Sequence, residues 1–238
     1  MPASLPAPAI VRSIVRALAP LADPMRAPPM VAYMRDQFAF LGIATPDRRA
    51  ATREIVRAAR ADADEEALVA AARSLWRKRE REYQYAAVDL LVACAAKLTP
   101  AVLPAVAGFI TTHSWWDTVD ALAAGVVGPL AMRHPVLRRT LDAWSSDDNL
   151  WLRRTAILHQ LRYGEATDAR RLFAYCVANA CDHDFFVRKA IGWALRQYAY
   201  TDPQAVRDFL RAEQGRLSPL SLREAGKHLQ KPIQGGTR

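Results

Sequence analysis

A pair of residues, one small and one apolar, recurs along this chain at an almost constant interval. It occurs as Ala87-Val88, Ala121-Leu122, Ala156-Ile157 and Ala190-Ile191, at separations of 34, 35 and 34 residues, and Ala225-Gly226 follows after another 35 with a second residue that is not apolar. A period of this size with two helices per unit is typical of stacked helical repeats, in which a small residue lets neighbouring helices approach. The alternative is a chance period in an alanine-rich chain. The regularity of the intervals favours the repeat.

The residue types between these pairs agree with a helical repeat. Ala, Leu, Arg and Glu fill nearly every segment, whereas alternating β-branched residues are rare. Prolines punctuate the chain where helices could begin, as in Thr45-Pro46, Thr99-Pro100 and Ser218-Pro219. We predict an all-α solenoid of stacked antiparallel helix pairs that forms a single domain over residues 1–238. Residues 1–8 and 234–238 are expected to be loose.

The excess of basic residues is compatible with a nucleic-acid partner but does not by itself establish one. The chain has 33 Lys and Arg against 24 Asp and Glu, a net charge of +9, and an isoelectric point near 9.9. A basic stripe for nucleic acid is one explanation of this excess. An arginine-heavy surface that reflects the host's composition is the other.

Several protein classes are disfavoured by the composition. Hydrophobic residues make up 51% and charged residues 24%, so large-scale disorder is not expected. The three cysteines lack CxxC spacing, which indicates thiols in a reducing compartment, and the histidines lack metal-ligand spacing. Arg12 and Arg16 interrupt the apolar start and no apolar run reaches membrane-spanning length, so we expect a cytoplasmic, nucleoid-associated protein without a membrane segment.

Side chains suited to a polyanion gather on one face of the second helix of each repeat. We set each repeat alanine at zero and step about 100° per residue, which collects these side chains in a sector of about 140°. The sector contains four aromatic residues and one histidine: Trp116, Trp151, Phe185, Trp193 and His159. It also contains the cations Arg154, Arg162, Arg188, Lys189 and Arg196 and the acid Asp120, and Glu82 stands at the corresponding place in the first repeat. Stacked repeats would join these faces into one concave basic groove.

Each of these residues also has a purely structural interpretation. A tryptophan at helical spacing is more often core than a ligand platform, and arginines on a helix stripe are commonly just solvated. Their coincidence on one face favours a surface for nucleic-acid backbone and stacked bases. Asp120 is expected to be the one acid among the cations of that face. It either forms a structural ion pair with Arg154 or Arg196, or stabilises a positive centre in a sugar or orients water.

Longer stretches resemble a known family. The chain resembles the AlkD-type DNA alkylation-repair glycosylases, which are built from HEAT-like helical repeats. The matching stretches are FLGIATPDRR (40–49), REYQYAAVD (81–89), SWWDTVD (114–120), DNLWLRRTAI (148–157), FFVRKAIGWALRQYA (185–199) and PLSLREA (219–225). Together they span residues from about 30 to 230.

The resemblance implies roles for individual residues. Asp120 would be the catalytic carboxylate, Trp116 and Trp193 would pack against the deoxyribose and backbone of the lesion, and Arg154 and Arg196 would hold phosphates. The sector adds Arg188, Lys189, Trp151 and Arg162 as expected DNA-binding residues. The implied reaction is hydrolysis of the N-glycosidic bond of cationic N3- or N7-alkylated purines in double-stranded DNA, leaving an abasic site, without base flipping. A monomer with no metal or organic cofactor is implied.

Two other functions remain open at this point. A non-catalytic helical-repeat protein could recognise damaged or branched DNA through phosphates and shape. A protein-interaction scaffold is a common use of helical solenoids, but the basic stripe disfavours it.

Overall fold

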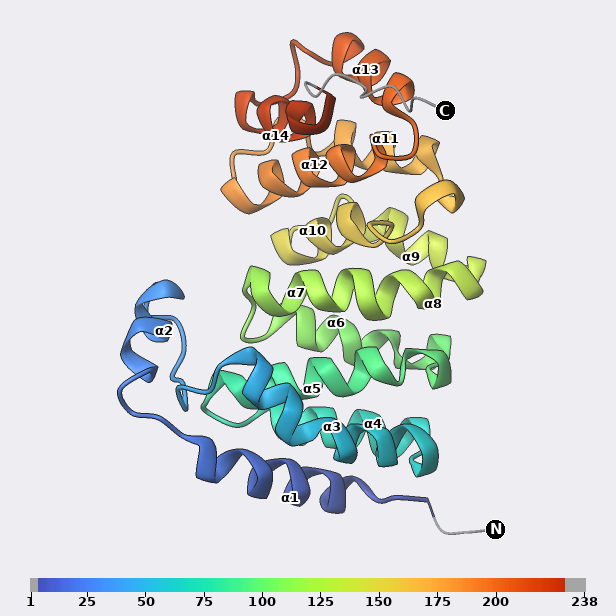
Figure 1. The fold of residues 1–238 in the computed structure, drawn as a ribbon. Coiled ribbons are helices and arrows are strands. Elements are labelled where there is room, and N and C mark those ends of the chain that lie inside the picture. Colours follow the sequence, from blue (N-terminus) through green and yellow to red (C-terminus); the bar gives the residue numbers. More distant parts are fainter. Residues whose placement is uncertain (1–3, 230–238) are drawn as a thin grey trace, which may run out of the picture. The chain divides into compact units, whose positions relative to one another are not determined.

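The computed structural model describes residues 4–229, and the regular elements among them are all helical (Figure 1). The β structure within this range is one isolated bridge between Ala39 and Glu80. The prediction of an all-α chain is therefore confirmed. Loose ends were expected at residues 1–8 and 234–238. Residues 1–3 and 234–238 lie outside the described residues, whereas Ala7 and Pro8 form the first turn of a helix.

The helices group into two compact units, Met1–Phe109 and Ile110–Arg238, called here the N-terminal and C-terminal units. A single domain over residues 1–238 stays a prediction. The α-helices of the N-terminal unit are α1 (Ala7–Leu18), α2 (Ala27–Tyr33), α3 (Thr45–Asp62), α4 (Glu65–Trp76) and α5 (Arg81–Ala93), and α6 (Leu103–Thr111) ends just beyond it. Short 3-10 turns join them at η1 (Ala19–Leu21), η2 (Ala95–Lys97) and η3 (Pro100–Val102).

Within the N-terminal unit, a buried acid ties a loop to α5. Glu82 is fully buried, and its carboxylate accepts the backbone N–H groups of Leu41, Gly42 and Ile43 at 2.8 to 3.0 Å. Gly42 has φ +87°, and a β-carbon there would lie 2.1 Å from the Asp23 carbonyl oxygen. Glu82, which the helical wheel placed in the ligand sector, thus has a structural role.

The C-terminal unit consists of successive helix pairs. Its α-helices are α7 (Trp116–Leu122), α8 (Gly128–Arg133), α9 (Arg138–Trp144), α10 (Leu150–Leu158), α11 (Ala169–Ala178), α12 (Phe185–Tyr198), α13 (Pro203–Ala212) and α14 (Pro219–Leu229). The short elements are η4 (Ala123–Val127), η5 (Pro135–Leu137) and η6 (Gly164–Ala166). Helix α9 packs on α10, α11 on α12 and α13 on α14, while α10 contacts both α7 and α12, and α12 contacts α14 (Figure 1). These neighbours form the predicted solenoid of stacked helix pairs.

The repeat alanines mark the same place in five helices. Ala87 lies in α5, Ala121 in α7, Ala156 in α10, Ala190 in α12 and Ala225 in α14. Four of them are fully buried, and Ala121 is partly buried. The apolar residues that follow the first four alanines are also buried. Close helix packing at small residues therefore explains the period.

The helix that carries SWWDTVD continues past α7 with altered geometry. The segment η4 is a π-helix, and Pro129 at the start of α8 lacks the N–H that an α-helix would use there. Gly128 lets the chain approach the next repeat, because a β-carbon there would lie 2.3 Å from the His159 carbonyl oxygen. This contact sets the start of α8 against the C-terminal end of α10.

Candidate active site

A pocket in the C-terminal unit is formed by side chains from three neighbouring helices. Its lining consists of Trp116 and Asp120 from α7, Arg154 from α10, and Phe185, Phe186, Lys189, Trp193 and Arg196 from α12. Its volume is about 340 Å³, at the lower end of the range of about 300 to 1,000 Å³ for small-ligand sites. Six of the nine predicted site residues thus meet in one pocket.

Helical spacing explains why α12 contributes most of this lining. Phe185, Lys189, Trp193 and Arg196 follow one another at intervals of four, four and three residues, which places them on one face. The Asp184 carboxylate accepts the Phe186 N–H at 2.7 Å and caps the helix. The cap starts α12 at its first aromatic residue, so both phenylalanines reach the pocket.

Asp120 and Arg154 form a two-point ion pair at the base of the pocket. The Arg154 Nε donates to Asp120 Oδ1 at 2.6 Å, and a terminal guanidinium nitrogen donates to Oδ2 at 2.7 Å. The remaining terminal nitrogen of Arg154 donates to the Phe186 carbonyl oxygen. The Arg154 side chain is 4% exposed and that of Asp120 is 14% exposed. The carboxylate is therefore held in one orientation, with a small part of its surface open to the pocket.

Burial controls the protonation of this carboxylate. It raises the pKa of Asp120 above the ordinary value, and the hydrogen bond and charge of Arg154 offset only part of this effect. Asp117 adds a smaller contribution in the same direction as burial. A carboxylate with a raised pKa is a stronger base than one exposed to water. This property suits a group that must stabilise a developing positive charge.

An aromatic cluster supports the pocket from behind. The rings of Trp115 and Trp151 both contact Phe186, with centroid distances of 5.0 and 5.1 Å, and lie 6.0 Å from each other. Phe185 crosses Phe186 nearly at right angles at 5.5 Å and is 53% exposed. Phe186 thus links the buried Trp151 and the partly buried Trp115 to an exposed aromatic ring.

The cations at the edge of the pocket share a buried acid from α14. Lys189 Nζ lies 2.8 Å from Glu224 Oε1, and Arg196 donates to Glu224 Oε2 at 3.0 Å. Lys227 also donates to Oε1, at 2.5 Å. Burial would raise the pKa of Glu224, but the hydrogen bonds and charges of the two lysines outweigh it and lower the pKa to about 2.

Comparison with known proteins assigns the chain to a family. The family model described as DNA alkylation repair enzyme matches residues 14–229, nearly the whole chain. The chain belongs to the DNA alkylation repair enzyme family. The solved structure of a predicted DNA alkylation repair enzyme from Enterococcus faecalis is similar, with 33% identity, a TM-score of 0.81, and coverage of 88% of this chain and 97% of that one. No curated protein matches the chain.

This repair-family chain departs from the sequence expectation at Trp151. The side chain was expected to contact DNA, but the residue is 9% exposed and does not line the pocket. Helix α10 lies between α7 and α12, and the rings of Trp115 and Phe186 cover the Trp151 side chain. Trp151 therefore packs in the aromatic cluster, and its contact with DNA stays a prediction.

Two predicted cations also lie away from the pocket. Helix α10 ends at Leu158, so Arg162 is in an exposed turn where the helical step no longer applies. His159, expected on the same face, is buried because its ring lies against Tyr163 and Tyr175, and burial lowers its pKa to about 4. Arg188 donates through Nε to the Asp182 carbonyl oxygen at 2.6 Å and is directed toward the loop before α12. Neither arginine lines the pocket.

Glu224 is the residue that the sequence analysis missed. Asp120 was expected to be the one acid among the cations, but Glu224 lies among Lys189, Arg196 and Lys227. The signal was present, because Glu224 precedes its repeat alanine by one residue, as Asp120 does. The repeat register alone could have placed both acids on the same face.

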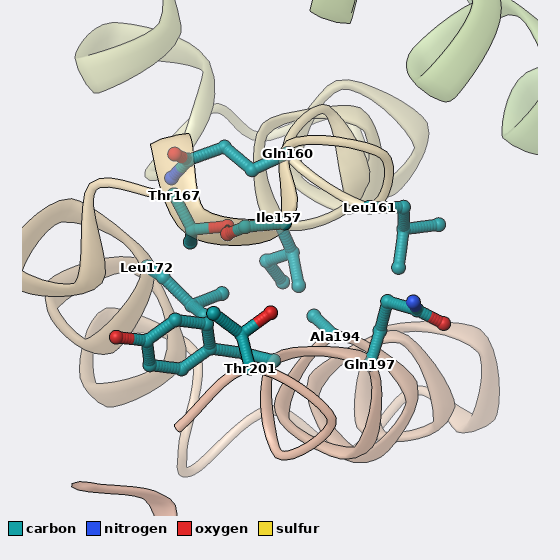
Figure 2. A pocket seen from close by; sticks show the side chains of 10 residues that line it. Ile157, Gln160, Leu161, Thr167, Leu172, Ala194, Gln197 and Thr201 are labelled. Atoms are coloured by element: carbon teal, nitrogen blue, oxygen red, sulfur yellow. The ribbon is translucent and has the colours of Figure 1, made fainter.

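A second cavity among α10, α11 and α12 holds little space. Figure 2 shows Gln160, Thr167, Gln197 and Thr201 around it together with apolar side chains. Its volume of about 20 Å³ is that of roughly one water molecule. It is therefore a packing gap between repeats and is too small for a nucleotide. Within residues 4–229, no three potential metal ligands converge and no helix has the length and apolarity to cross a membrane.

Proposed function

We propose that this protein is a monofunctional DNA glycosylase that releases cationic N3- or N7-alkylated purines from duplex DNA and leaves an abasic site. One observation carries the proposal: the Asp120 carboxylate is fixed by Arg154 at the base of an aromatic pocket whose edge is cationic. Membership of the DNA alkylation repair family supports the substrate class. The ion pair and the aromatic lining support the type of reaction.

The substrate chemistry explains why so small a set of groups would suffice. Alkylation at N3 or N7 makes the purine cationic, so the base leaves with the electron pair of the N-glycosidic bond and becomes neutral. The sugar is left with oxocarbenium character at C1′. Water then adds through its oxygen to C1′ and loses one proton, which gives the abasic hemiacetal. The difficult species is the cationic sugar.

Asp120 is placed to stabilise that cation. Its negative charge is fixed by Arg154, so the carboxylate needs no reorganisation as positive charge develops in the sugar. The raised pKa makes the same carboxylate a stronger acceptor for a proton of the attacking water. In this proposal Arg154 orients Asp120 and does not hold a phosphate, because its guanidinium is buried and occupied.

The pocket lining favours recognition of charge over recognition of base edges. Trp116, Phe185 and Trp193 provide aromatic faces for the deoxyribose and the cationic lesion. The lining contains no Asn, Gln, Ser or Thr side chain, although hydrogen bonding to the base edge is how enzymes read a flipped base. We propose that the lesion is selected by its positive charge and remains in the stack.

The decisive experiment measures base release from methylated duplex DNA. Wild type should release methylated purines, and Asp120→Asn should lose at least about 100-fold in rate, as removal of one preorganised electrostatic group commonly does. Asp208→Asn is a matched control, since Asp208 forms an exposed ion pair with Arg211 outside the pocket. Wild-type protein without base release, or Asp120→Asn with wild-type rate, contradicts the proposal.

One observation favours a second candidate, a DNA-binding protein without catalysis. Arg154 engages both oxygens of Asp120, as a structural ion pair would. In that case the pocket would bind damaged or branched DNA through its cations. Salt-sensitive binding that produces no abasic site, and that survives Asp120→Asn, would support this candidate.

A further inference from the structure

The most unexpected feature of the pocket edge is a buried acid in a cationic surface. Glu224 is 7% exposed at its side chain and removes one unit of the positive charge that would attract DNA. If attraction alone mattered, the surface would bind a polyanion better without it. Its contacts with three cations suit a positioning role.

Packing between α12 and α14 holds the Glu224 carboxylate in place. The two helices meet at Gly192, where an added β-carbon would lie 2.4 Å from Glu224 Cβ and 2.9 Å from the Ser221 carbonyl oxygen. The Ser221 hydroxyl donates to the Arg188 carbonyl oxygen at 2.9 Å and adds a second link between the helices. The acid is therefore anchored by backbone packing.

The anchored carboxylate in turn orders three flexible cations. Each carboxylate oxygen of Glu224 accepts from the pocket side, Oε1 from Lys189 and Oε2 from Arg196. Lys227 shares Oε1 with Lys189, so the two ammonium groups lie side by side. Long Lys and Arg side chains lose rotamer entropy when they are fixed. Ordering in the free protein lowers that cost on binding.

We propose that Glu224 is a positioning residue that arrays Lys189, Arg196 and Lys227 as a clamp for the backbone phosphates of duplex DNA. The cluster carries a net charge of about +2, which matches phosphates that each carry one negative charge. Its three cations are 37%, 27% and 53% exposed, so they remain accessible while the acid is buried. The identity of the polyanion rests on the proposed function, whereas the positioning role of Glu224 rests on the contacts.

The test is whether DNA affinity rises or falls when Glu224 is replaced by a neutral residue. Glu224→Gln raises the net charge by one unit, so simple attraction predicts tighter binding of a short fluorescein-labelled unmodified duplex. The clamp predicts the opposite, with a dissociation constant raised by about threefold to tenfold. Over about 50 to 200 mM salt, the slope of log affinity against log salt should fall in magnitude by about one. Tighter binding, or an unchanged slope, overturns the proposal.

A matched control has the same substitution and the same charge change elsewhere. Glu213 pairs with Arg216 and does not line the pocket, so Glu213→Gln should bind the duplex as tightly as wild type with an unchanged slope. Urea unfolding of each variant identifies any loss of affinity that comes from instability. Lys227→Met serves as a second test, because this exposed side chain is not part of the core. It should also lower the slope by about one, and wild-type behaviour contradicts the clamp.

Catalysis provides a readout that a general structural role would not give. Because the Asp120–Arg154 pair is separate from Glu224, Glu224→Gln should raise the KM for alkylated duplex while kcat stays within about threefold. Equal loss of kcat and kcat/KM would contradict the positioning role. Binding of unmodified duplex does not require base release. The clamp can therefore fail while the glycosylase proposal stands, and the reverse also holds.

Discussion

Substitution of both partners of the Asp120–Arg154 pair separates its structural role from its chemical one. Asp120→Asn leaves a guanidinium that is 4% exposed without its carboxylate. Breaking a buried ion pair from one side commonly costs about 3 to 5 kcal/mol. We expect about 3 kcal/mol, because the Asn carbonyl can still accept one hydrogen bond and the Phe186 carbonyl oxygen still binds Arg154.

The double variant Asp120→Asn with Arg154→Gln should recover most of this loss. Two neutral amides can pair with each other, so no buried charge remains and the free energy of unfolding should return to within about 1 kcal/mol of wild type. Urea unfolding with equal slopes for all variants provides the comparison. The recovery is a stability effect alone.

Base release should not recover in the double variant. If Asp120 stabilises the cationic sugar, both the single and the double variant should lose at least about 100-fold in single-turnover rate, which corresponds to about 2.7 kcal/mol of barrier. The assay uses excess enzyme on N7-methylguanine duplex, at a temperature where every variant is folded. A double variant that regains the wild-type rate along with its stability would refute the catalytic reasoning and leave Asp120 as a structural acid.

Three further predictions concern the same unit. The rate of base release, corrected for spontaneous loss, should fall with decreasing pH as Asp120 is protonated. Because the pKa of Asp120 is raised, the fall should begin at a higher pH than for an exposed Asp. A rate that does not change with pH in the acidic range would contradict this role of Asp120. Gly192→Val should lower the free energy of unfolding, measured with urea, by about 1 to 3 kcal/mol, because its β-carbon would overlap Glu224. An unchanged free energy of unfolding would contradict the close approach of the two helices. Trp151→Ala should cost about 3 to 5 kcal/mol in stability, whereas Trp193→Ala should mainly slow base release in the kinetic assay; the reverse pattern would exchange their roles.

Helical periodicity explains why much of the pocket could be predicted from sequence. Trp116 and Asp120 are four residues apart in α7, and Lys189 and Trp193 are four apart in α12, so each pair shares a face wherever the helix packs. The repeat period then places both faces on the same side of the stacked helices, with α10 between them. No tertiary contact had to be known for this step, because it depends on backbone geometry alone.

The same reasoning fails where a helix ends or is covered. Arg162 lies in a turn beyond the last residue of α10, so the helical step does not apply to it. His159 keeps helical backbone angles, but the rings of Tyr163 and Tyr175 pack against it. Trp151 stands at the same repeat position as Trp116, yet it is buried because the rings of Trp115 and Phe186 pack against it. Helix ends and neighbours depend on packing over distances that a local pattern does not contain.

By itself, the sequence determined an all-α chain of helical repeats and the set of aromatic and charged residues that share one face, since both follow from the 3.6-residue helix and the spacing of small residues. Only the tertiary structure decided which partners these residues choose. Arg154 reaches Asp120 from the next repeat, and Glu224 gathers the cations of α12 from α14. Long side chains can pair in several directions, and the choice among them is made by how closely neighbouring helices pack, as at Gly192.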